Sequence, residues 1–224
     1  METTLGLRTD LTPFYQLAEQ DAKIGKLVRR FAGFRPPRFP TVFEALANAI
    51  ACQQLSLAVG IILLNRLARA HGGGLSTGSP MAAFPSPEQI AKAHPEQLCE
   101  LGFSHRKAHA LIGIAKQFVS GGDRFGNFGR LDDATALNRL LALRGIGRWS
   151  AEYVMLRGLS RLHVFPADDV AGQKNLHRWL GLRRTPSYER VRQLLVRWHP
   201  YEGLIYFQFL LANLEARGLV HGAD

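Results

Sequence analysis

The sequence predicts an all-α protein of 224 residues. Apolar residues recur at the helical spacing of three and four, whereas strict alternation never continues for more than a few residues. Such apolar stripes run through 59–67, 111–118 and 191–198. Hydrophobic residues make up 46% of the chain, so we expect a folded body with a sizeable core rather than a disordered chain.

Helix starts are marked along the chain. Thr41 precedes a predicted helix and has Glu44 three residues later, the pattern of a capping box. Pro87 follows Ser86 and suits a first helical position. The intervening stretches rich in proline or glycine are 34–40, 71–87 and 120–130. None is long enough to tether independent domains, so we expect about ten helices in one compact body.

The charge balance favours a polyanionic partner. Lys and Arg number 28 against 18 Asp and Glu, which gives a formal net charge of +10 and an isoelectric point of about 10.2. Nucleic acid is the leading candidate for such a partner. A merely soluble basic protein would have the same composition, so that alternative stays open.

Cysteine content and hydropathy restrict the compartment. Cys52 and Cys99 are too few for a disulfide framework, a four-cysteine cluster or a cysteine-rich zinc site, and both are expected to be buried thiols. The first ten residues lack a basic region followed by an apolar run, and no apolar stretch approaches the roughly 18 residues of a membrane span. We therefore expect a cytoplasmic, nucleoid-associated protein with no membrane partner.

The segment LRGIGRWS places two glycines before a predicted helix. Gly145 can take a positive φ, Gly147 can let another backbone come close, and the next helix would begin near Arg148. The unpaired N–H groups of that helix start would accept a phosphate. An ordinary tight turn between two helices explains the glycines equally well, because a single G-x-G is weak evidence.

Two adjacent acids follow in the segment FPADDV. Asp168 and Asp169 lie at the apparent start of a helix after Pro166, where one of them is expected to be the N-cap. A second acid in so basic a chain suggests a carboxylate kept ionised by the helix dipole.

Together these motifs resemble a known family. The segments 143–156 and 165–170 are similar to the helix-hairpin-helix plus Gly/Pro-Asp motif (HhH-GPD) of base-excision DNA glycosylases. The segments 35–56 and 84–108 resemble the 3-methyladenine DNA glycosylase II (AlkA) type of that superfamily. The resemblance covers roughly 34–214, and its motifs occur in the family's order.

The resemblance implies an all-α, two-lobed fold with a DNA-binding cleft between the lobes. One six-helix lobe, expected over 41–164, would carry the hairpin, and 1–40 with 165–224 would form the other. The type commonly has an additional N-terminal α/β domain, for which the roughly 35 residues before Phe34 leave no room.

The resemblance also implies the reaction. Asp169 matches the family's catalytic aspartate, and Asp168 takes a helper or capping role. The carboxylate would stabilise an oxocarbenium-like transition state and orient water. Glycosylases that also cleave the strand use a lysine where Trp149 stands, so the implied enzyme is a monofunctional glycosylase that releases alkylated bases such as 3-methyladenine and 7-methylguanine and leaves an abasic site.

Further roles follow from the alignment with the family. Trp149 and Tyr153, four residues apart, would form one wall of the base pocket, and Leu210 replaces a pocket aromatic, which implies a wider pocket. Gln54 would fill the gap left by the flipped nucleotide, with Leu55 as its neighbour.

The hairpin itself would hold the DNA backbone. The implied contacts come from Gly145, Gly147, Arg148 and Ser150. Backbone carbonyls of the same hairpin can hold a Na, K or Mg ion in this family, and they map to Leu141, Leu143 and Ile146. No cofactor is required, and the expected partner is damaged double-stranded DNA bound by a monomer.

Two alternatives remain open. One is a uracil- or mismatch-directed glycosylase of the same superfamily, which would have to help a neutral base leave. The other is a non-enzymatic helix-hairpin-helix module that grips the DNA backbone, in which Asp169 is only a cap and Trp149 only a core residue.

Overall fold

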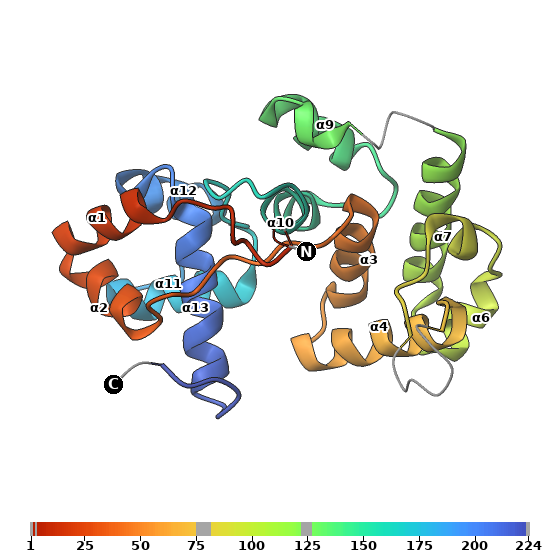
Figure 1. The fold of residues 1–224 in the computed structure, drawn as a ribbon, viewed down its shortest axis with the longest axis horizontal. Coiled ribbons are helices and arrows are strands. Elements are labelled where there is room, and N and C mark those ends of the chain that lie inside the picture. Colours follow the sequence, from red (N-terminus) through yellow and green to blue (C-terminus); the bar gives the residue numbers. More distant parts are fainter. Residues whose placement is uncertain (1, 3, 75–81, 122–126, 223–224) are drawn as a thin grey trace. The chain divides into compact units, whose positions relative to one another are not determined.

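The structure of the protein is a computed structural model that describes residues 2, 4–74, 82–121 and 127–222. Within these residues the chain is helical, and its only β-pairing is an isolated bridge between Gly74 and Ala82 (Figure 1). This confirms the all-α prediction. The parts of the predicted 71–87 and 120–130 loops at 75–81 and 122–126 lie outside the described residues. Across the described helices, none has both the length and the apolar character that crossing a bilayer would need.

The chain divides into two compact units, 41–154 and 1–40 with 155–224. The expected division had the same first boundary but a second one at 164, whereas the observed one lies inside a helix. The helices of the 41–154 unit are α3 (Val42–Cys52), α4 (Leu57–His71), α5 (Pro87–Ala91), α6 (Pro95–Glu100), α7 (His105–Ser120), the 3-10 helix η1 (Phe128–Arg130), α9 (Asp133–Leu141) and the first half of α10 (Arg148–Leu159). Those of the other unit are α1 (Thr12–Gln20), α2 (Ala22–Arg30), the second half of α10, α11 (Val170–Leu180), α12 (Tyr188–Leu195), the 3-10 helix η2 (Val196–Trp198) and α13 (Glu202–Glu215).

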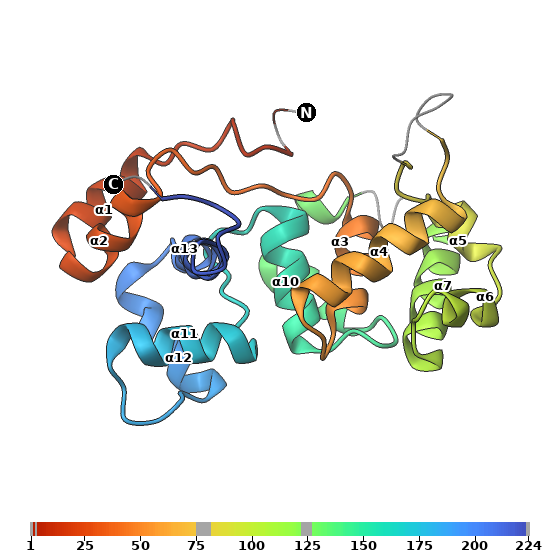
Figure 2. The same ribbon diagram turned by 90° about the horizontal axis from the view of Figure 1, so that it is seen from below.

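Helix α3 is the central element of the 41–154 unit. Most of its residues are buried, and it packs against both α4 and α7 (Figure 2). The contact with α4 is close, because a Cβ at Gly60 would come within 2.3 Å of the Cys52 Sγ atom. The cysteines differ from expectation, since Cys52 and Cys99 are free thiols that are only half-buried.

The apolar stripe of α4 is only partly a core stripe. Leu63 and Leu67 are buried as the periodicity predicts, and Gly60 is buried as well. Val59 and Ile62 were part of the same stripe, yet they are 41% and 48% exposed. Helical spacing identifies which face of a helix is apolar but not how much of that face is buried. In α4 the buried face is narrower than the apolar face.

Predicted helix caps form with one change. The Thr41 hydroxyl accepts a hydrogen bond from the Glu44 backbone N–H, but the Glu44 carboxylate accepts from the Thr41 hydroxyl rather than from its amide. Burial raises the pKa of Glu44, and the hydrogen bond from Thr41 opposes this effect. Ser86 forms a complete capping box with Gln89, and Pro87 lies at the helix start as predicted.

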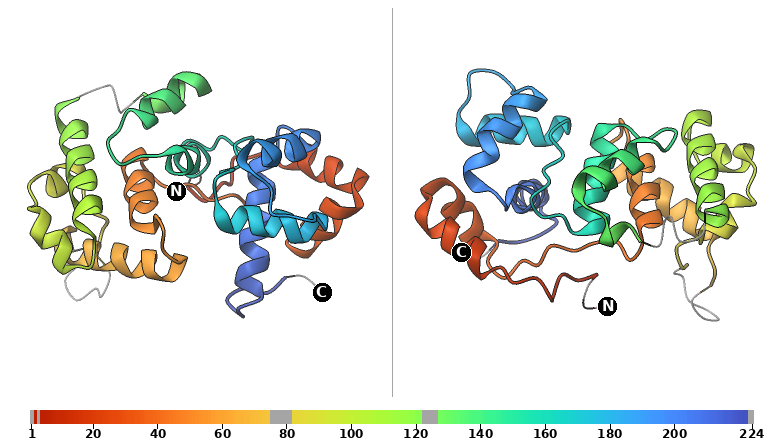
Figure 3. Two further views of the ribbon diagram at one scale, coloured as in Figure 1. Left: turned by 180° about the vertical axis from the view of Figure 1, so that it is seen from behind. Right: turned by 90° about the horizontal axis from the view of Figure 1, so that it is seen from above.

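The other unit is built from two segments that are distant in sequence. Figures 1 to 3 show α1 and α2 in one group with α11, α12 and α13. Both segments supply its core, in which Phe14, Ile24, Leu176, Trp198 and Phe207 are almost fully buried. A hydrogen bond of 2.8 Å from the Trp198 indole Nε1 to the Asp21 Oδ2 atom connects the two segments. Asp21 is also the N-cap of α2.

Helix α13 starts in close contact with the chain that leads to α11. The Gly203 amide donates to the Leu162 carbonyl at 2.7 Å. A Cβ at Gly203 would lie 2.7 Å from that oxygen and 2.8 Å from the Val164 oxygen. The glycine therefore allows an approach that a side chain would block, and it sets the position of α13 relative to the segment before α11.

Asp21→Ala is expected to destabilise the protein by about 2–4 kcal/mol at neutral pH. The substitution removes a helix cap, worth about 1 kcal/mol, and leaves the buried Trp198 indole without an acceptor, which costs about 1–3 kcal/mol. Urea unfolding would measure the loss. Asp132→Ala is the control, because Asp132 caps α9 through the Thr135 amide and hydroxyl; an equal loss in both variants would contradict the role given to the indole.

The contribution of Asp21 is expected to fall in acid. Burial acts to raise the pKa of Asp21, but hydrogen bonds from Trp198, Ile24 and Lys23 outweigh burial and hold it below its ordinary value of 3.8. A lowered pKa means that the carboxylate stabilises the fold fully above that ordinary value and loses this effect as the pH falls through the folded-state pKa. The stability difference between wild type and Asp21→Ala should therefore shrink below about pH 3.8.

Candidate functional site

The predicted hairpin is present and joins α9 to α10. Helix α10 begins at Arg148, as the sequence indicated. The turn is closed by a 3.1 Å hydrogen bond from the Ile146 amide to the Leu143 carbonyl, and the side chains of both residues are buried. Gly145 has a φ of +90°, the positive value expected of it.

The two glycines of the hairpin differ from expectation in one respect. Close packing was expected at Gly147, but a Cβ there would meet nothing within 4 Å. At Gly145 a Cβ would come within 2.6 Å of the Ala110 Cβ on α7. Gly145 therefore serves both the turn and the packing, and Gly147 leaves open space beside the start of α10.

In the first turn of α10, backbone amides are the candidate groups for binding a phosphate, because not all of its side chains are exposed. The amides of Arg148, Trp149 and Ser150 have no partner four residues earlier within the helix, as in any first turn. Gly147 and Arg148 are exposed. Ser150 as a whole residue is only 2% exposed, and its hydroxyl accepts a hydrogen bond from Gln53, so the contact with DNA expected of it stays a prediction.

Two side chains hold the loop between α3 and α4 against its neighbours in this unit. The Gln53 Nε2 atom donates to the Gly145 carbonyl at 2.9 Å and to the Ser150 Oγ atom at 3.0 Å. The Lys107 Nζ atom donates to the carbonyls of Ala51 and Gln53 at 2.9 and 2.8 Å. Burial lowers the pKa of Lys107, and the nearby Cys52 acts in the opposite direction.

Gln54 and Leu55 lie at the exposed tip of this loop. Gln54 has a φ of +56°, which is uncommon for a residue other than glycine, and Leu55 is 43% exposed. Strained backbone persists only where the surroundings fix it, and Gln53 and Lys107 provide that support. The arrangement is compatible with a side chain held ready to insert into a duplex, which stays a prediction.

Trp149 and Tyr153 stack on each other along one face of α10. Their ring centroids are 5.4 Å apart with an interplanar angle of 27°. The Tyr153 hydroxyl donates to the Asn48 Oδ1 atom at 2.8 Å, which anchors the pair to α3. The Trp149 indole Nε1 is buried and has no hydrogen-bond partner among the described residues. The pair thus provides an aromatic wall that contains a buried donor without a partner among the described residues.

Asp169 is the N-cap of α11, which settles which of the two acids caps the helix. Its Oδ1 atom accepts from the Ala171 amide at 3.2 Å, and its Oδ2 atom accepts from the Tyr206 hydroxyl at 2.7 Å. The capping role considered for Asp168 therefore belongs to Asp169 itself. Both acids are half-buried, and Asp168 lies in the turn before the helix.

Leu210 lies on α13, one helical turn after Tyr206, and is half-buried. It belongs to the same unit as Asp169, whereas Trp149 and Tyr153 belong to the 41–154 unit. The wider pocket expected from Leu210 stays a prediction.

A hairpin cation would depend on backbone oxygens. No cluster of three or more His, Cys, Asp or Glu side chains suited to a metal occurs in the part of the chain that the structure describes. Carbonyl oxygens are hard donors that suit Na, K or Mg, and the carbonyl of Leu143 retains one lone pair beside its bond to Ile146. With Leu141 and Ile146 it stays a predicted site.

Sequence reasoning missed Gln53, Lys107, Asn48 and Tyr206. Gln53 directly precedes Gln54, for which a DNA contact is predicted, but its side chain bonds to the hairpin, while Gln54 is exposed. Tyr206 is 37 residues from Asp169, and no local pattern indicates that the two meet.

Gln53→Ala is expected to lower the free energy of unfolding by about 1–3 kcal/mol, because the buried Ser150 hydroxyl and the Gly145 carbonyl lose their donor. Gln54→Ala is the matched control, and as an exposed substitution it should change stability by about 0.5 kcal/mol or less. Urea titration of both variants would measure the difference. Equal effects would mean that the Gln53 amide does not support the hairpin.

Comparisons with known proteins agree with this geometry. A family model described as HhH-GPD superfamily base excision DNA repair protein matches residues 47–200. The chain is similar to a DNA-3-methyladenine glycosylase from Bacillus subtilis, at 31% identity over 202 residues that cover 90% of this chain and 67% of the relative.

Solved structures show the same likeness. The chain is similar to a 3-methyladenine DNA glycosylase from Archaeoglobus fulgidus with a TM-score of 0.85 and 31% identity, covering 98% of this chain and 74% of the other. It is similar to a 3-methyladenine DNA glycosylase of Schizosaccharomyces pombe in complex with abasic DNA, with a TM-score of 0.74, 27% identity and coverage of 86% and 92%. Because the family model matches well over half of its residues, the chain belongs to the HhH-GPD superfamily of base excision DNA repair proteins.

Proposed function

We propose that this protein is a monofunctional DNA glycosylase that flips alkylated bases out of double-stranded DNA and releases them, leaving an abasic site. The observation that carries the proposal is the half-buried carboxylate of Asp169 at the N-terminus of α11, in a chain that also has the hairpin and the stacked aromatic pair. The names of the similar proteins support alkylated bases as the substrate class.

Asp169 would act electrostatically. Breaking a glycosidic bond builds positive charge on the sugar, and a fixed carboxylate stabilises that charge. The Ala171 amide at the helix N-terminus holds the group, and the positive end of a helix dipole favours a negative charge at that place. A base with an alkylated ring nitrogen already carries positive charge, so it leaves without an added general acid. One carboxylate therefore suffices for this substrate class.

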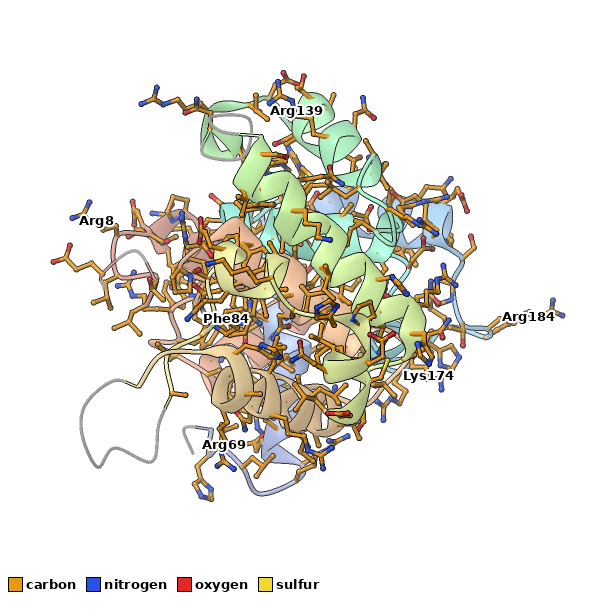
Figure 4. The ribbon with its side chains drawn as sticks, turned by 90° about the vertical axis from the view of Figure 1, so that its right-hand side faces the viewer. Arg8, Arg69, Phe84, Arg139, Lys174 and Arg184 are labelled. Carbon is orange, nitrogen blue, oxygen red and sulfur yellow. The ribbon has the colours of Figure 1, made fainter. Side chains whose placement is uncertain are left out.

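The proposed enzyme should not cleave the DNA strand, because Trp149 stands at the hairpin position where strand-cleaving relatives have a lysine. Lyase chemistry needs an amine that attacks the sugar carbon, and the Trp149 indole cannot form a Schiff base. Lys174 lies on α11 one turn after Asp169 and is exposed, as Figure 4 shows, which suits contact with phosphate or solvent.

Trp149 and Tyr153 would bind the flipped base. An electron-poor, cationic base gains up to about 2 kcal/mol from cation–π attraction to a desolvated indole. The Trp149 indole N–H adds a donor that a base acceptor could satisfy. Because Leu210 replaces an aromatic ring, the pocket should accept small alkylated bases beyond 3-methyladenine.

The hairpin and the α3–α4 loop would grip the duplex. Backbone amides at the start of α10 and the exposed Arg148 suit phosphate, which fixes position without reading sequence. Flipping costs a few kcal/mol, least at damaged pairs, and Gln54 would fill the space in the stack with Leu55 beside it. We propose that the protein does this as a monomer and needs no cofactor, with any hairpin cation in a structural role.

Asp169→Asn is expected to reduce base release from methylated duplex DNA by at least about 100-fold while keeping the affinity for an abasic duplex. Free bases would be identified by chromatography, and the strand should stay intact until alkali is added. Asp10→Asn is the matched control. The Asp10 carboxylate also accepts a hydrogen bond from the amide two residues later, that of Thr12, and it lies outside the proposed site.

Other outcomes would replace the proposal. Release from a uracil-containing duplex alone would favour the uracil- or mismatch-directed alternative. Salt-sensitive binding without any base release would favour the non-enzymatic DNA-binding module. Equal loss of release and binding in Asp169→Asn would remove the catalytic role of that carboxylate.

Binding to undamaged duplex is expected to weaken steeply with salt. If about four phosphates are engaged, the slope of log K against log[salt] would be near −3.6, and Arg148→Ala should make it shallower by about 1. Fluorescence anisotropy would measure both. Arg69→Ala is the control, because Arg69 extends outward from the last turn of α4, at the opposite end of that helix from Gln54 (Figure 4). An affinity that does not change with salt concentration would refute the proposed contacts with the DNA phosphates.

A further inference from the structure

Both oxygens of the Asp169 carboxylate have hydrogen-bond donors, and the donors come from different helices. The Ala171 amide reaches Oδ1 from within α11, at 3.2 Å. The Tyr206 hydroxyl reaches Oδ2 from α13, at 2.7 Å. An O–H to carboxylate distance this short is typical of charge-assisted hydrogen bonds, which are about twice as strong as neutral ones.

The ring of Tyr206 is itself held in place. Phe165 packs edge-on against it, with centroids 5.3 Å apart at an interplanar angle of 87°. Phe165 is 6% exposed and also contacts Phe209, whose ring is 6.4 Å away at 82°. A Cβ at Gly172 would come within 3.2 Å of the Phe165 ring, so α11 closes that side. The hydroxyl therefore has a defined position.

The backbone that carries Tyr206 is fixed as well. Gly203, three residues earlier, bonds to the Leu162 carbonyl and allows α13 to start in close contact with the segment that leads to Asp169. The Tyr206 hydroxyl and the Asp169 carboxylate lie in the same compact unit. The contact at Gly203, about one helical turn before Tyr206, sets the distance between α13 and the segment that leads to Asp169.

We infer that Tyr206 is a positioning residue for base release, and this inference rests on the proposed function. A carboxylate has about four lone-pair sites, and here one on each oxygen is already engaged. Rotation of the carboxyl group is thereby restrained, and the remaining lone pairs keep one direction. A preorganised charge needs no reorganisation when the sugar becomes positive, which is the source of most electrostatic catalysis.

Tyr206→Phe tests the role, since it removes the hydroxyl and keeps the ring against Phe165. Under single-turnover conditions on methylated duplex, we expect the rate of base release to fall about 10- to 100-fold, the range that losing a hydrogen bond to a charged group produces. Affinity for an abasic duplex should change by less than about twofold, because the hydroxyl is assigned no DNA contact. Tyr15→Phe is the matched control, because the Tyr15 hydroxyl accepts a hydrogen bond from the Gly33 amide within the same unit but lies outside the proposed site.

A double-mutant cycle separates positioning from a general effect on the fold. In the Asp169→Asn background, adding Tyr206→Phe should change the residual rate by less than about twofold, since the group that Tyr206 orients is gone. A merely structural tyrosine would lower the rate in both backgrounds. The ¹³Cγ resonance of Asp169 should also move in Tyr206→Phe and stay unchanged in Tyr15→Phe, a readout that needs no substrate.

Failure of this inference differs from failure of the proposed function. A Tyr206→Phe rate equal to wild type, or an equal loss in both backgrounds, overturns the positioning role while leaving the glycosylase in place. A wild-type protein that releases no base from methylated duplex overturns the proposed function, and the positioning role with it. In that case the Asp169 resonance still shows whether Tyr206 restrains the carboxylate.

Discussion

The N-terminus of α11 is the constraint on which the candidate catalytic site depends. It holds a carboxylate by a backbone amide in a chain whose net charge is +10, and no arginine or lysine among the described residues forms an ion pair with it. A cationic partner would neutralise the charge that an oxocarbenium-like sugar needs. A backbone N–H and a neutral tyrosine hydroxyl add no positive charge beside the carboxylate and still fix its direction.

Much of this site follows from local sequence, and the rest does not, for a physical reason. The start of α10, the positive φ at Gly145 and an aspartate cap on α11 are consequences of residues next to one another. The Tyr206 bond joins residues 37 apart and depends on how α13 packs, which no local periodicity encodes. Likewise Gly145, and not Gly147, is the hairpin glycine packed against α7, because only the position of α7 decides which glycine it meets.

The boundary between the two compact units also could not be predicted from local sequence. Helix α10 is continuous from Arg148 to Leu159, so nothing in its local structure shows that its first residues belong to one unit and its last to the other. The neighbouring glutamines show the limit at single-residue scale. Gln53 points inward to the hairpin and Gln54 is exposed with strained backbone, although the two residues are chemically identical. Residue type alone therefore does not indicate which of the two bonds to the hairpin.

The continuity of α10 restricts how this chain can change in evolution. Trp149 and Tyr153 lie in its part of one unit and Leu156 in its part of the other, with no loop between them. One residue inserted into the helix would rotate everything after it by about 100° and shift it by about 1.5 Å. Insertions in exposed connections such as 183–185 are absorbed at little energetic cost. Length variation among descendants of this sequence should therefore accumulate in its loops and be absent from α10.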